Sequence, residues 1–302
     1  MRTVRTVADL RALLAPERRA GRRIALVPTM GALHGGHTSL IEAAARTTDL
    51  VVVSLFVNPA QFNDAGDLDA YPRTEAQDAT AAQAAGAHVL FAPDAAEVYP
   101  AGFATTVAVR GPLTESLEGA HRGSAHFDGV TTVVTKLFGM VGPDVAFFGR
   151  KDAQQAQVIR ALVRDLNLPV RIELCPTVRE ADGLALSSRN ARLDGPGREN
   201  ALALSRALGE VADGIARGHL RTGAAAGEAG LSALRRHGAQ PEYFCAVDPA
   251  SMVPAETLDG DVLLVCAANV AGVRLIDNLP ITSHHLDAEA VTLIDRASTV
   301  AN

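Results

Sequence analysis

Short apolar runs alternate with helical segments over residues 1–175. Each run has the length of a buried strand, and the segments between them carry apolar residues at helical spacing. The predicted strands are Ile24–Met30, Leu50–Val57, His88–Phe91, Asp144–Phe148 and Val170–Cys175. The predicted helices are residues 36–46, 78–86, 130–141 and 152–165. Because parallel strands need a crossover helix between them, this alternation predicts an α/β fold with a doubly wound, Rossmann-like parallel sheet.

The pattern changes after Pro176. Residues 179–193 are polar and predict a loop, and two helical segments follow at 198–217 and 223–237. Three short β-like runs come next, at Tyr243–Val247, Val262–Ala267 and Val273–Ile276. We therefore expect two domains, a Rossmann-like domain over residues 1–177 and a smaller α+β domain over residues 178–302. The tail after Thr282, with His284 and His285, is expected to be a solvated surface segment.

Composition and charge narrow the function classes. The 302 residues are 48% hydrophobic and 21% charged, with a formal net charge of −6. An acidic chain without a basic run is a poor candidate for binding nucleic acid, whose phosphates demand clustered Lys and Arg. The N-terminus lacks the apolar core of a signal peptide, and no apolar run approaches the roughly 18 residues of a membrane span. We expect neither nucleic-acid nor membrane partners.

Cysteine usage bears on the compartment. Cys175, Cys245 and Cys266 lie far apart, and none forms a Cys-x-x-Cys pair. Unpaired cysteines are typical of a reducing compartment. The sequence therefore predicts a cytoplasmic protein.

The segment Pro28–His37, which reads PTMGALHGGH, joins a predicted strand to a predicted helix. Its three glycines let a ligand approach the backbone. Unpaired N–H groups and the helix dipole make a helix N-terminus an anion-binding corner. His34 and His37 are three residues apart and lie on one side of this first turn. Two imidazoles at such a corner indicate a polyphosphate, and hence nucleotide chemistry.

Two other interpretations of this pair stay open at this point. A His-x-x-His pair is half of a zinc site, but zinc needs three or four ligands and the cysteines are remote from this segment. Alternatively, His34 and His37 only cap the helix. The rest of the chain has to decide between these interpretations and an anion-binding site.

A second anion-binding corner is predicted where the strand ending at Phe148 meets the next helix. Gly149 turns the chain there, and Lys151 and Asp152 stand at the mouth of the helix. A lysine can neutralise phosphate and an aspartate can bind a ribose hydroxyl. Only two of the 28 basic residues are lysines, Lys136 and Lys151, so a compact ammonium is a candidate requirement at this corner. The alternative is an N-cap aspartate beside a solvated lysine.

A third polar cluster opens the second domain. Ser187, Ser188 and Arg189 place two hydroxyls and a guanidinium in one loop. On a flexible hinge this loop could fold over a bound triphosphate. The alternative is a simple helix N-cap.

Amides follow the second predicted strand, in the segment FVNPAQF. Ligands of α/β sheets bind at the carboxyl ends of the strands, so Asn58 and Gln61 are expected to face the same crevice as the two histidines. The alternative is turn chemistry at Asn-Pro. Arg122 and His126, which precede the predicted helix at 130, are candidates for a carboxylate-binding arginine and a further imidazole.

Seven segments in series resemble one known family. They are PTMGALHGGH, FVNPAQF, YPRT at 71–74, EG…R…HFDGVTTVVTKLF, FGRKDAQQ, PTVREADGLALSSRN and RLIDN at 274–278. Together they are similar to the pantothenate synthetase (pantoate–β-alanine ligase) family of the nucleotidylyl-transferase superfamily, over residues 3–281. The chain departs from the family pattern after Arg122, where one extra residue precedes His126 and a proline is missing.

The resemblance implies roles for individual residues. The implied catalytic residues are His34, His37, Lys151 and Arg189. Those implied for ATP binding are Pro28, Thr29, Met30, His34, His37, Gly149, Lys151, Asp152, Val178, Ser187, Ser188 and Arg189. Pantoate is implied to contact Met30, Gln61 and Gln155, and β-alanine to lie among Asn58, Gln61, Arg122 and His126. No metal ligands are implied.

The activity that the resemblance implies has two steps. The pantoate carboxylate attacks ATP to give pantoyl adenylate and pyrophosphate, and β-alanine then displaces AMP to give pantothenate. Magnesium with ATP and a homodimer are implied as well. Two alternatives are another nucleotidylyl transferase on this scaffold, and an RNA- or nucleotide-binding module without turnover. The amides at Asn58, Gln61 and Gln155, which suit a small hydroxy acid, argue against the first, and the negative net charge argues against the second.

Overall fold

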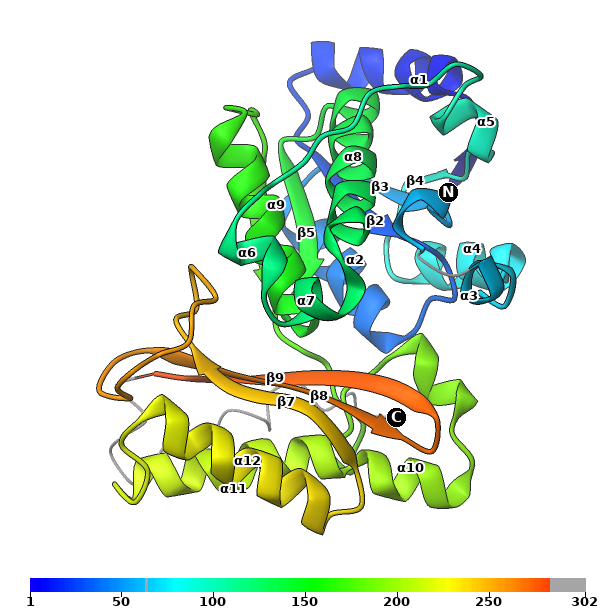
Figure 1. The fold of residues 1–302 in the computed structure, drawn as a ribbon. Coiled ribbons are helices and arrows are strands. Elements are labelled where there is room, and N and C mark those ends of the chain that lie inside the picture. Colours follow the sequence, from blue (N-terminus) through cyan, green and yellow to red (C-terminus); the bar gives the residue numbers. More distant parts are fainter. Residues whose placement is uncertain (63–64, 283–302) are drawn as a thin grey trace. The chain divides into compact units, whose positions relative to one another are not determined.

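The computed structural model describes residues 1–62 and 65–282, so the expectation for the tail after Thr282 lies outside the described residues. Contacts divide the chain into two compact units. The first unit comprises Met1–Arg150 and Gln154–Cys175, and the second comprises Lys151–Ala153 and the chain from Pro176 onward. Figure 1 labels most of the helices and strands of the two units.

The first unit is built on a six-stranded sheet with the order β1-β4-β3-β2-β5-β6. Every neighbouring pair is parallel, which confirms the predicted Rossmann-like α/β fold. The strands are β1 (Arg2–Val4), β2 (Ile24–Thr29), β3 (Leu50–Leu55), β4 (Val89–Phe91), β5 (Val145–Gly149) and β6 (Arg171–Cys175). The short edge strand β1 was not predicted, because three residues are too few to show a period.

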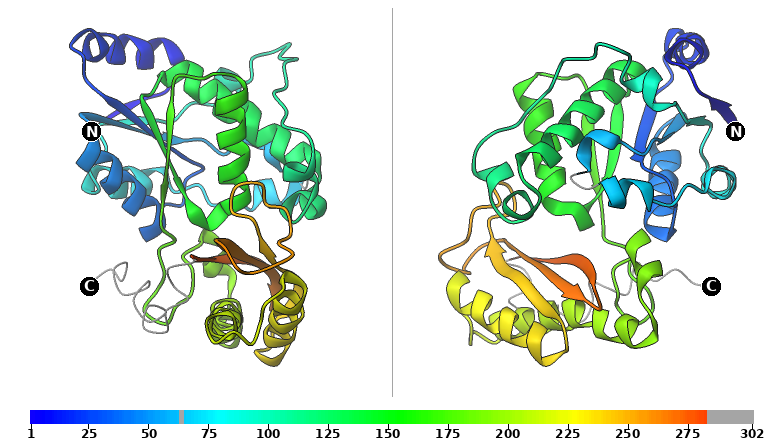
Figure 2. Two further views of the ribbon diagram at one scale, coloured as in Figure 1. Left: turned by 90° about the vertical axis from the view of Figure 1, so that its left-hand side faces the viewer. Right: turned by 45° about the vertical axis from the view of Figure 1, so that its right-hand side comes forward.

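Alternate residues of these strands build two separate cores. Ile24 and Leu26 of β2 enter one buried cluster, and Ala25 and Val27 enter the other. Side chains of β-strands point to opposite faces in turn, so runs that are apolar throughout need cover on both faces. Helices α1, α8 and α9 supply the first cluster, and α2 and α4 supply the second. Figure 2 shows the long α8 (green) lying against this sheet.

The first unit has more helices than the pattern predicts, and three of the predicted ones, α2, α4 and α8, begin earlier than expected. They are α1 (Val7–Arg19), α2 (Gly35–Thr47), α3 (Ala65–Asp69), α4 (Glu75–Ala84), α5 (Ala95–Val98), α6 (Pro112–Glu115), α7 (Glu118–Arg122), α8 (Ser124–Val141) and α9 (Ala153–Asp165), with the short 3-10 turn η1 (Pro59–Gln61). A second 3-10 turn, η2 (Arg150–Asp152), has Arg150 in the first unit and Lys151 and Asp152 in the second. Helix α8 starts six residues before the predicted position, because His126 and Phe127 are already buried in its first turn. Among the described residues, no helix is long and apolar enough to cross a membrane.

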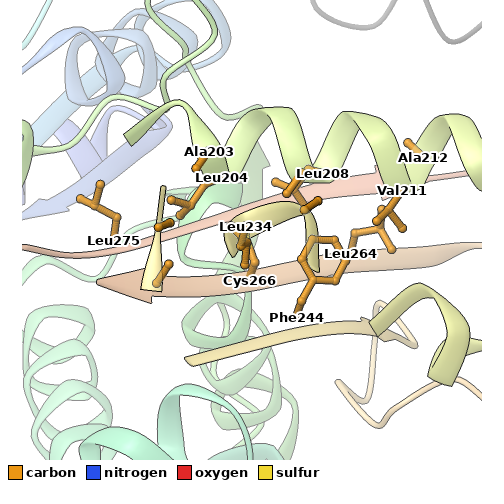
Figure 3. Close-up of a cluster of buried hydrophobic side chains, with 14 of the residues drawn as sticks. Ala203, Leu204, Leu208, Val211, Ala212, Leu234, Phe244, Leu264, Cys266 and Leu275 are labelled. Atoms are coloured by element: carbon orange, nitrogen blue, oxygen red, sulfur yellow. The ribbon is translucent and has the colours of Figure 1, made fainter. Parts of the chain in front are cut away.

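The second unit has a three-stranded antiparallel sheet with the order β7-β8-β9. Its elements are η3 (Ser188–Arg192), α10 (Gly195–Ala201), α11 (Ala203–Ala216), α12 (Gly223–Arg236), β7 (Gln240–Val247), β8 (Val262–Val270) and β9 (Val273–Ile281). Leu204 and Leu208 of α11 pack with Phe244 of β7 and Leu264 of β8 (Figure 3). The helix predicted over 198–217 is two helices, and all three strands are longer than predicted.

Candidate active site

The order of the strands in the six-stranded sheet indicates where a ligand is expected to bind. From β2 the chain continues through β3 and β4 toward one edge, whereas β5 and β6 lie on the other side of β2. Ligands of such sheets bind beyond the carboxyl ends of the strands, at the point where the strand order reverses. The segment that follows β2 carries His34 and His37, and β5 ends at Gly149, two residues before Lys151. Both predicted anion-binding corners therefore begin at the two strands that flank this point.

His34 and His37 form a reciprocal cap on α2. The Nδ1 atom of His34 accepts a hydrogen bond from the Gly36 backbone N–H at 3.1 Å, and Nδ1 of His37 accepts from the His34 backbone N–H at 3.4 Å. Their rings lie 4.2 Å apart between centroids. Because both Nδ1 atoms accept, each neutral imidazole carries its proton on Nε2. The cap thus fixes two Nε2–H donors beside a helix N-terminus, so capping and anion binding are compatible here.

A buried carboxylate holds the loop in front of these histidines. Asp78 of α4 is 3% exposed and accepts hydrogen bonds from the backbone N–H groups of Leu33 and Ala32 at 2.7 and 3.1 Å. The hydroxyl of Thr74 donates to the same carboxylate at 3.1 Å. Ala32 has a φ of 50°, in the left-handed region that costs an alanine about 1–2 kcal/mol. Asp78 therefore stabilises a strained turn that places His34.

Replacing Asp78 with alanine is expected to lower stability by about 1–3 kcal/mol, because it leaves two part-buried N–H groups without their acceptor. The loop at Gly31–His34 is expected to lose order, so the rate of the chemical step should fall as well. Urea unfolding and single-turnover kinetics on the same preparation measure both effects. Asp165→Ala, at an exposed carboxylate on α9, is the matched control. An Asp78→Ala variant with unchanged stability would contradict the assigned role.

Met30, Asn58 and Gln61 form one cluster in the first unit. The Asn58 side-chain NH2 donates to Gln61 Oε1 at 3.0 Å, and the Gln61 NH2 lies 3.1 Å from the sulfur of Met30. Nδ1 of His126 lies 2.8 Å from the backbone oxygen of Gln61. The structure therefore brings together four of the residues predicted to surround the two small substrates.

The close approach of α8 to η1 makes this cluster possible. A Cβ atom added at Gly129 would lie 2.3 Å from the backbone oxygen of Ala60, so only glycine allows this approach. The backbone oxygen of Gly129 then accepts from Asn58 at 3.1 Å. Asn58 also accepts from the backbone N–H of Ala60, as expected for an Asn-Pro turn. The geometry of Asn58 is therefore that of an Asn-Pro turn, and it is also compatible with a place beside the substrates.

Arg122 is the last residue of α7 and is half-buried. Its Nε atom lies 2.9 Å from a carboxylate oxygen of Glu118, one helical turn earlier. Gly123, with a φ of 77°, separates α7 from α8, and the other two residues before His126 form the start of α8. Gln154 supports this region: it is 4% exposed, accepts from the Glu118 backbone N–H, and donates to the backbone oxygens of Leu113 and Ser116.

In the second unit, Lys151 is held through its backbone. The side-chain NH2 of Asn278, on β9, donates to the backbone oxygen of Lys151 at 2.8 Å. The neighbouring Asp277 makes a two-pronged ion pair with Arg179, at 2.6 and 2.9 Å, and both side chains are largely buried. A planar guanidinium matches a carboxylate in this geometry. The RLIDN segment thus fixes the chain at Lys151.

The other predicted site residues are distributed over both units. In the second unit, Ser187 caps η3 by accepting from the backbone N–H of Arg189 at 3.2 Å, so the predicted N-cap is present. Val178 is buried there, and Asp152 is exposed. In the first unit, Thr29 of β2 is buried and donates to the Ser54 backbone oxygen at 2.7 Å. Pro28, Gly149 and Gln155 are half-buried.

No cluster of three or more His, Cys, Asp or Glu side chains within residues 1–62 and 65–282 could hold a metal ion. All three cysteines lie in the described residues and are free thiols, with pKa values raised, chiefly by burial.

Four residues with supporting contacts were not assigned by the sequence reasoning: Asp78, Tyr99, Gln154 and Asn278. Each acts through a hydrogen bond to a residue far away in the chain. Asn278 had a signal, since it ends the RLIDN motif. Gln154 had one too, since it lies in the FGRKDAQQ motif, whereas Asp78 and Tyr99 lie in segments whose local pattern is that of an ordinary helix or turn.

A Rossmann-like sheet with a histidine-capped helix at its switch point defines a nucleotide-binding α/β enzyme. The sequence profile of the pantoate-beta-alanine ligase family matches residues 2–280. The chain therefore belongs to the pantoate–β-alanine ligase family, whose enzymes join pantoate and β-alanine to form pantothenate.

Individual relatives agree with this assignment. Pantothenate synthetase of Chelativorans sp. (strain BNC1) is 53% identical over 281 residues, which cover 92% of this chain and 96% of that protein. The crystal structure of pantothenate synthetase from Thermus thermophilus is similar with a TM-score of 0.87 and 46% identity, over 92% of this chain and 99% of that one. Pantoate-beta-alanine ligase from Francisella tularensis, complexed with beta-gamma ATP and beta-alanine, has a TM-score of 0.75 and 32% identity, over 92% and 97% of the two chains.

Proposed function

We propose that this chain forms pantothenate from pantoate, β-alanine and ATP through a pantoyl-adenylate intermediate, and that the residues predicted from the sequence carry out the two steps. The observation that carries the proposal is the pair of oriented imidazole donors at the N-terminus of α2, in the same unit as the amide cluster of Met30, Asn58 and Gln61.

In the first step a pantoate carboxylate oxygen forms a bond to the α-phosphorus of ATP, and the bond to the β-phosphate oxygen breaks to release pyrophosphate. A carboxylate is ionised at neutral pH, so no general base is needed. The obstacle is repulsion between an anion and a polyanion. Catalysis therefore depends on positioning and charge neutralisation, for which we propose His34, His37, Lys151 and Arg189.

Substrate contacts follow from the same proposal. ATP would be held by Pro28, Thr29, Met30, His34, His37, Gly149, Lys151, Asp152, Val178, Ser187, Ser188 and Arg189. Pantoate would be held by Met30, Gln61 and Gln155, with the Gln61 amide already ordered by its neighbours. Asn58, Gln61, Arg122 and His126 would surround β-alanine.

In the second step the neutral amine of β-alanine bonds to the acyl carbon, the bond to the AMP oxygen breaks, and the nitrogen loses a proton. An acyl adenylate hydrolyses readily, so this step needs a site that excludes water. We propose the loop at Ser187–Arg189 as the lid that closes over bound nucleotide.

Three further properties belong to the proposal. Mg²⁺ would enter with ATP and neutralise its phosphates, since Mg²⁺ prefers phosphate oxygens and water; no side-chain ligand is assigned to it. The enzyme would act as a homodimer, as the family resemblance implies. It would work in the cytoplasm, for which its free thiols are suited.

The test is ATP–pyrophosphate exchange in the presence of Mg²⁺. Exchange is expected with pantoate alone, and net AMP release is expected once β-alanine is added. Exchange with a different acid or with a phosphorylated alcohol, but not with pantoate, would overturn the substrate assignment and leave the nucleotide chemistry in place.

A further inference from the structure

Tyr99 lies outside every residue set assigned above, yet it contacts the amide cluster directly. Its hydroxyl donates to Asn58 Oδ1 at 2.8 Å. The ring is held between Phe56 and Phe103, with centroids 6.1 and 5.0 Å away. The ammonium of Lys136 lies 4.5 Å from the centroid of Phe103 and 5.7 Å from that of Tyr99, within the range of cation–π attraction. These contacts fix the direction of the Tyr99 hydroxyl.

Asn58 is fully engaged in hydrogen bonds. Oδ1 accepts from Tyr99 and from the Ala60 backbone N–H at 3.3 Å, and Nδ2 donates to Gly129 and Gln61. A side-chain amide has two donors and two acceptor lone pairs, so all four are used here. With 1% of its surface exposed, Asn58 has no capacity left for a direct bond to substrate. Its polar atoms therefore reach a substrate through Gln61, so that beside β-alanine Asn58 acts as a positioning residue.

The orientation of Asn58 decides which end of the Gln61 side-chain amide is available to a ligand. Because Asn58 offers Nδ2, Gln61 turns its oxygen toward Asn58 and its NH2 toward the sulfur of Met30 at 3.1 Å. A thioether is a weak acceptor, so a carboxylate or hydroxyl oxygen of a ligand is a better partner for this NH2. The cluster therefore selects a hydrogen-bond acceptor at this position.

We infer that Tyr99 is a positioning residue for the pantoate site: acting through Asn58, it holds Gln61 as a hydrogen-bond donor to an oxygen of the substrate. This inference rests on the proposed function, which places pantoate at Gln61. Burial raises the pKa of Tyr99 to about 12. The hydroxyl therefore remains a donor throughout the pH range of an enzyme assay. The hydrogen-bond relay from Tyr99 through Asn58 to Gln61 thus keeps its direction.

The experiment is a double-mutant cycle on Tyr99 and Gln61. Tyr99→Phe removes the hydroxyl and leaves the ring in place. It is expected to raise the KM for pantoate in ATP–pyrophosphate exchange about 3- to 10-fold, as for one uncharged hydrogen bond, with the KM for ATP within about 2-fold of wild type. Gln61→Ala is expected to raise the pantoate KM further, and the double variant should equal Gln61→Ala alone, because Tyr99 acts only through Gln61.

Tyr243→Phe is the matched control, since it removes the same hydroxyl from a tyrosine on β7 of the second unit that has no part in the hydrogen-bond chain. It is expected to leave the pantoate KM unchanged. An unchanged pantoate KM in Tyr99→Phe would overturn the inference. So would effects that add in the double variant, or a joint rise of both KM values accompanied by a fall in Tm, which marks a purely structural role.

A failure of the proposed function can be told apart from a failure of this inference. If wild-type protein shows no pantoate-dependent exchange, the substrate assignment is wrong. The relay itself is then read from the side-chain NH2 signals of Asn58 and Gln61 in NMR spectra. Tyr99→Phe should speed hydrogen exchange at both groups, and unchanged exchange would overturn the relay.

Discussion

The variant His34→Asn is expected to keep the stability of the wild type and to lose at least about 100-fold in the rate of adenylate formation, the usual effect of removing one donor to a developing negative charge. Asparagine is among the best N-cap residues, and its side-chain oxygen can accept from the Gly36 N–H as His34 Nδ1 does. The substitution therefore retains the cap and removes only the Nε2–H donor. Pyrophosphate release in a single turnover, and Tm on the same sample, measure the two effects separately.

Two further variants complete this experiment. His34→Ala removes both the donor and the cap. It should therefore lose about 1 kcal/mol of stability, and its rate of adenylate formation should fall as far as in His34→Asn. His219→Ala, at an exposed histidine of the second unit, should change neither quantity. If His34→Asn releases pyrophosphate within a few-fold of wild type, the histidine is only a helix cap, which is the alternative that the sequence left open.

The sequence predicts the strand–turn–helix geometry of this corner well because its information is local. The strand ending at Thr29, the glycines and the two histidines follow one another within a single strand–turn–helix segment, and their spacing defines the first turn of α2. The apolar runs similarly locate β2 to β5, since these strands are buried on both faces. The edge strand β6 has only Cys175 buried, and its alternating apolar residues located it. A cap signal was also present for the unpredicted α1, where Thr6 accepts from the backbone N–H of Asp9.

The supporting contacts could not be predicted, because they join residues that are distant in the chain. Asp78 lies 46 residues from Ala32, Tyr99 lies 41 residues from Asn58, and Asn278 lies 127 residues from Lys151. Such a pair leaves no period or spacing in the sequence. Each of these side chains also lies in or beside a helix or strand whose own residue pattern explains why it forms. Its polar contact therefore becomes visible only in the folded structure.

The predicted ends of some helices and strands were wrong for a related reason. The predicted β9 stops at Ile276, because the polar pair that follows looks like the end of a strand. In the structure β9 continues to Ile281, and Asp277 and Asn278 are buried within it. Asp277 is compensated by Arg179 and Asn278 by the backbone of Lys151. Polar residues can remain inside a strand only where such partners exist, and these partners come from other segments.

Replacing Lys151 with arginine is expected to slow adenylate formation by about 100-fold or more, nearly as much as Lys151→Met, although the positive charge is kept. The backbone at Lys151 is tethered by Asn278, so a side chain cannot adjust its reach by moving the main chain. A compact ammonium on a flexible stem and a planar guanidinium place their donors differently, which matters when a phosphate oxygen must be met at one position. Single-turnover pyrophosphate release at saturating ATP and pantoate measures the chemical step.

Arg164→Lys, an exposed position on α9, is the control for an exchange between the two cations and should behave as wild type. Near-normal turnover of Lys151→Arg combined with a slow Lys151→Met would mean that any cation suffices. Near-normal turnover of both variants would remove Lys151 from the catalytic set. We expect slow turnover of both Lys151→Arg and Lys151→Met. That result would also explain why position 151 holds one of only two lysines in a chain whose other basic residues are arginines.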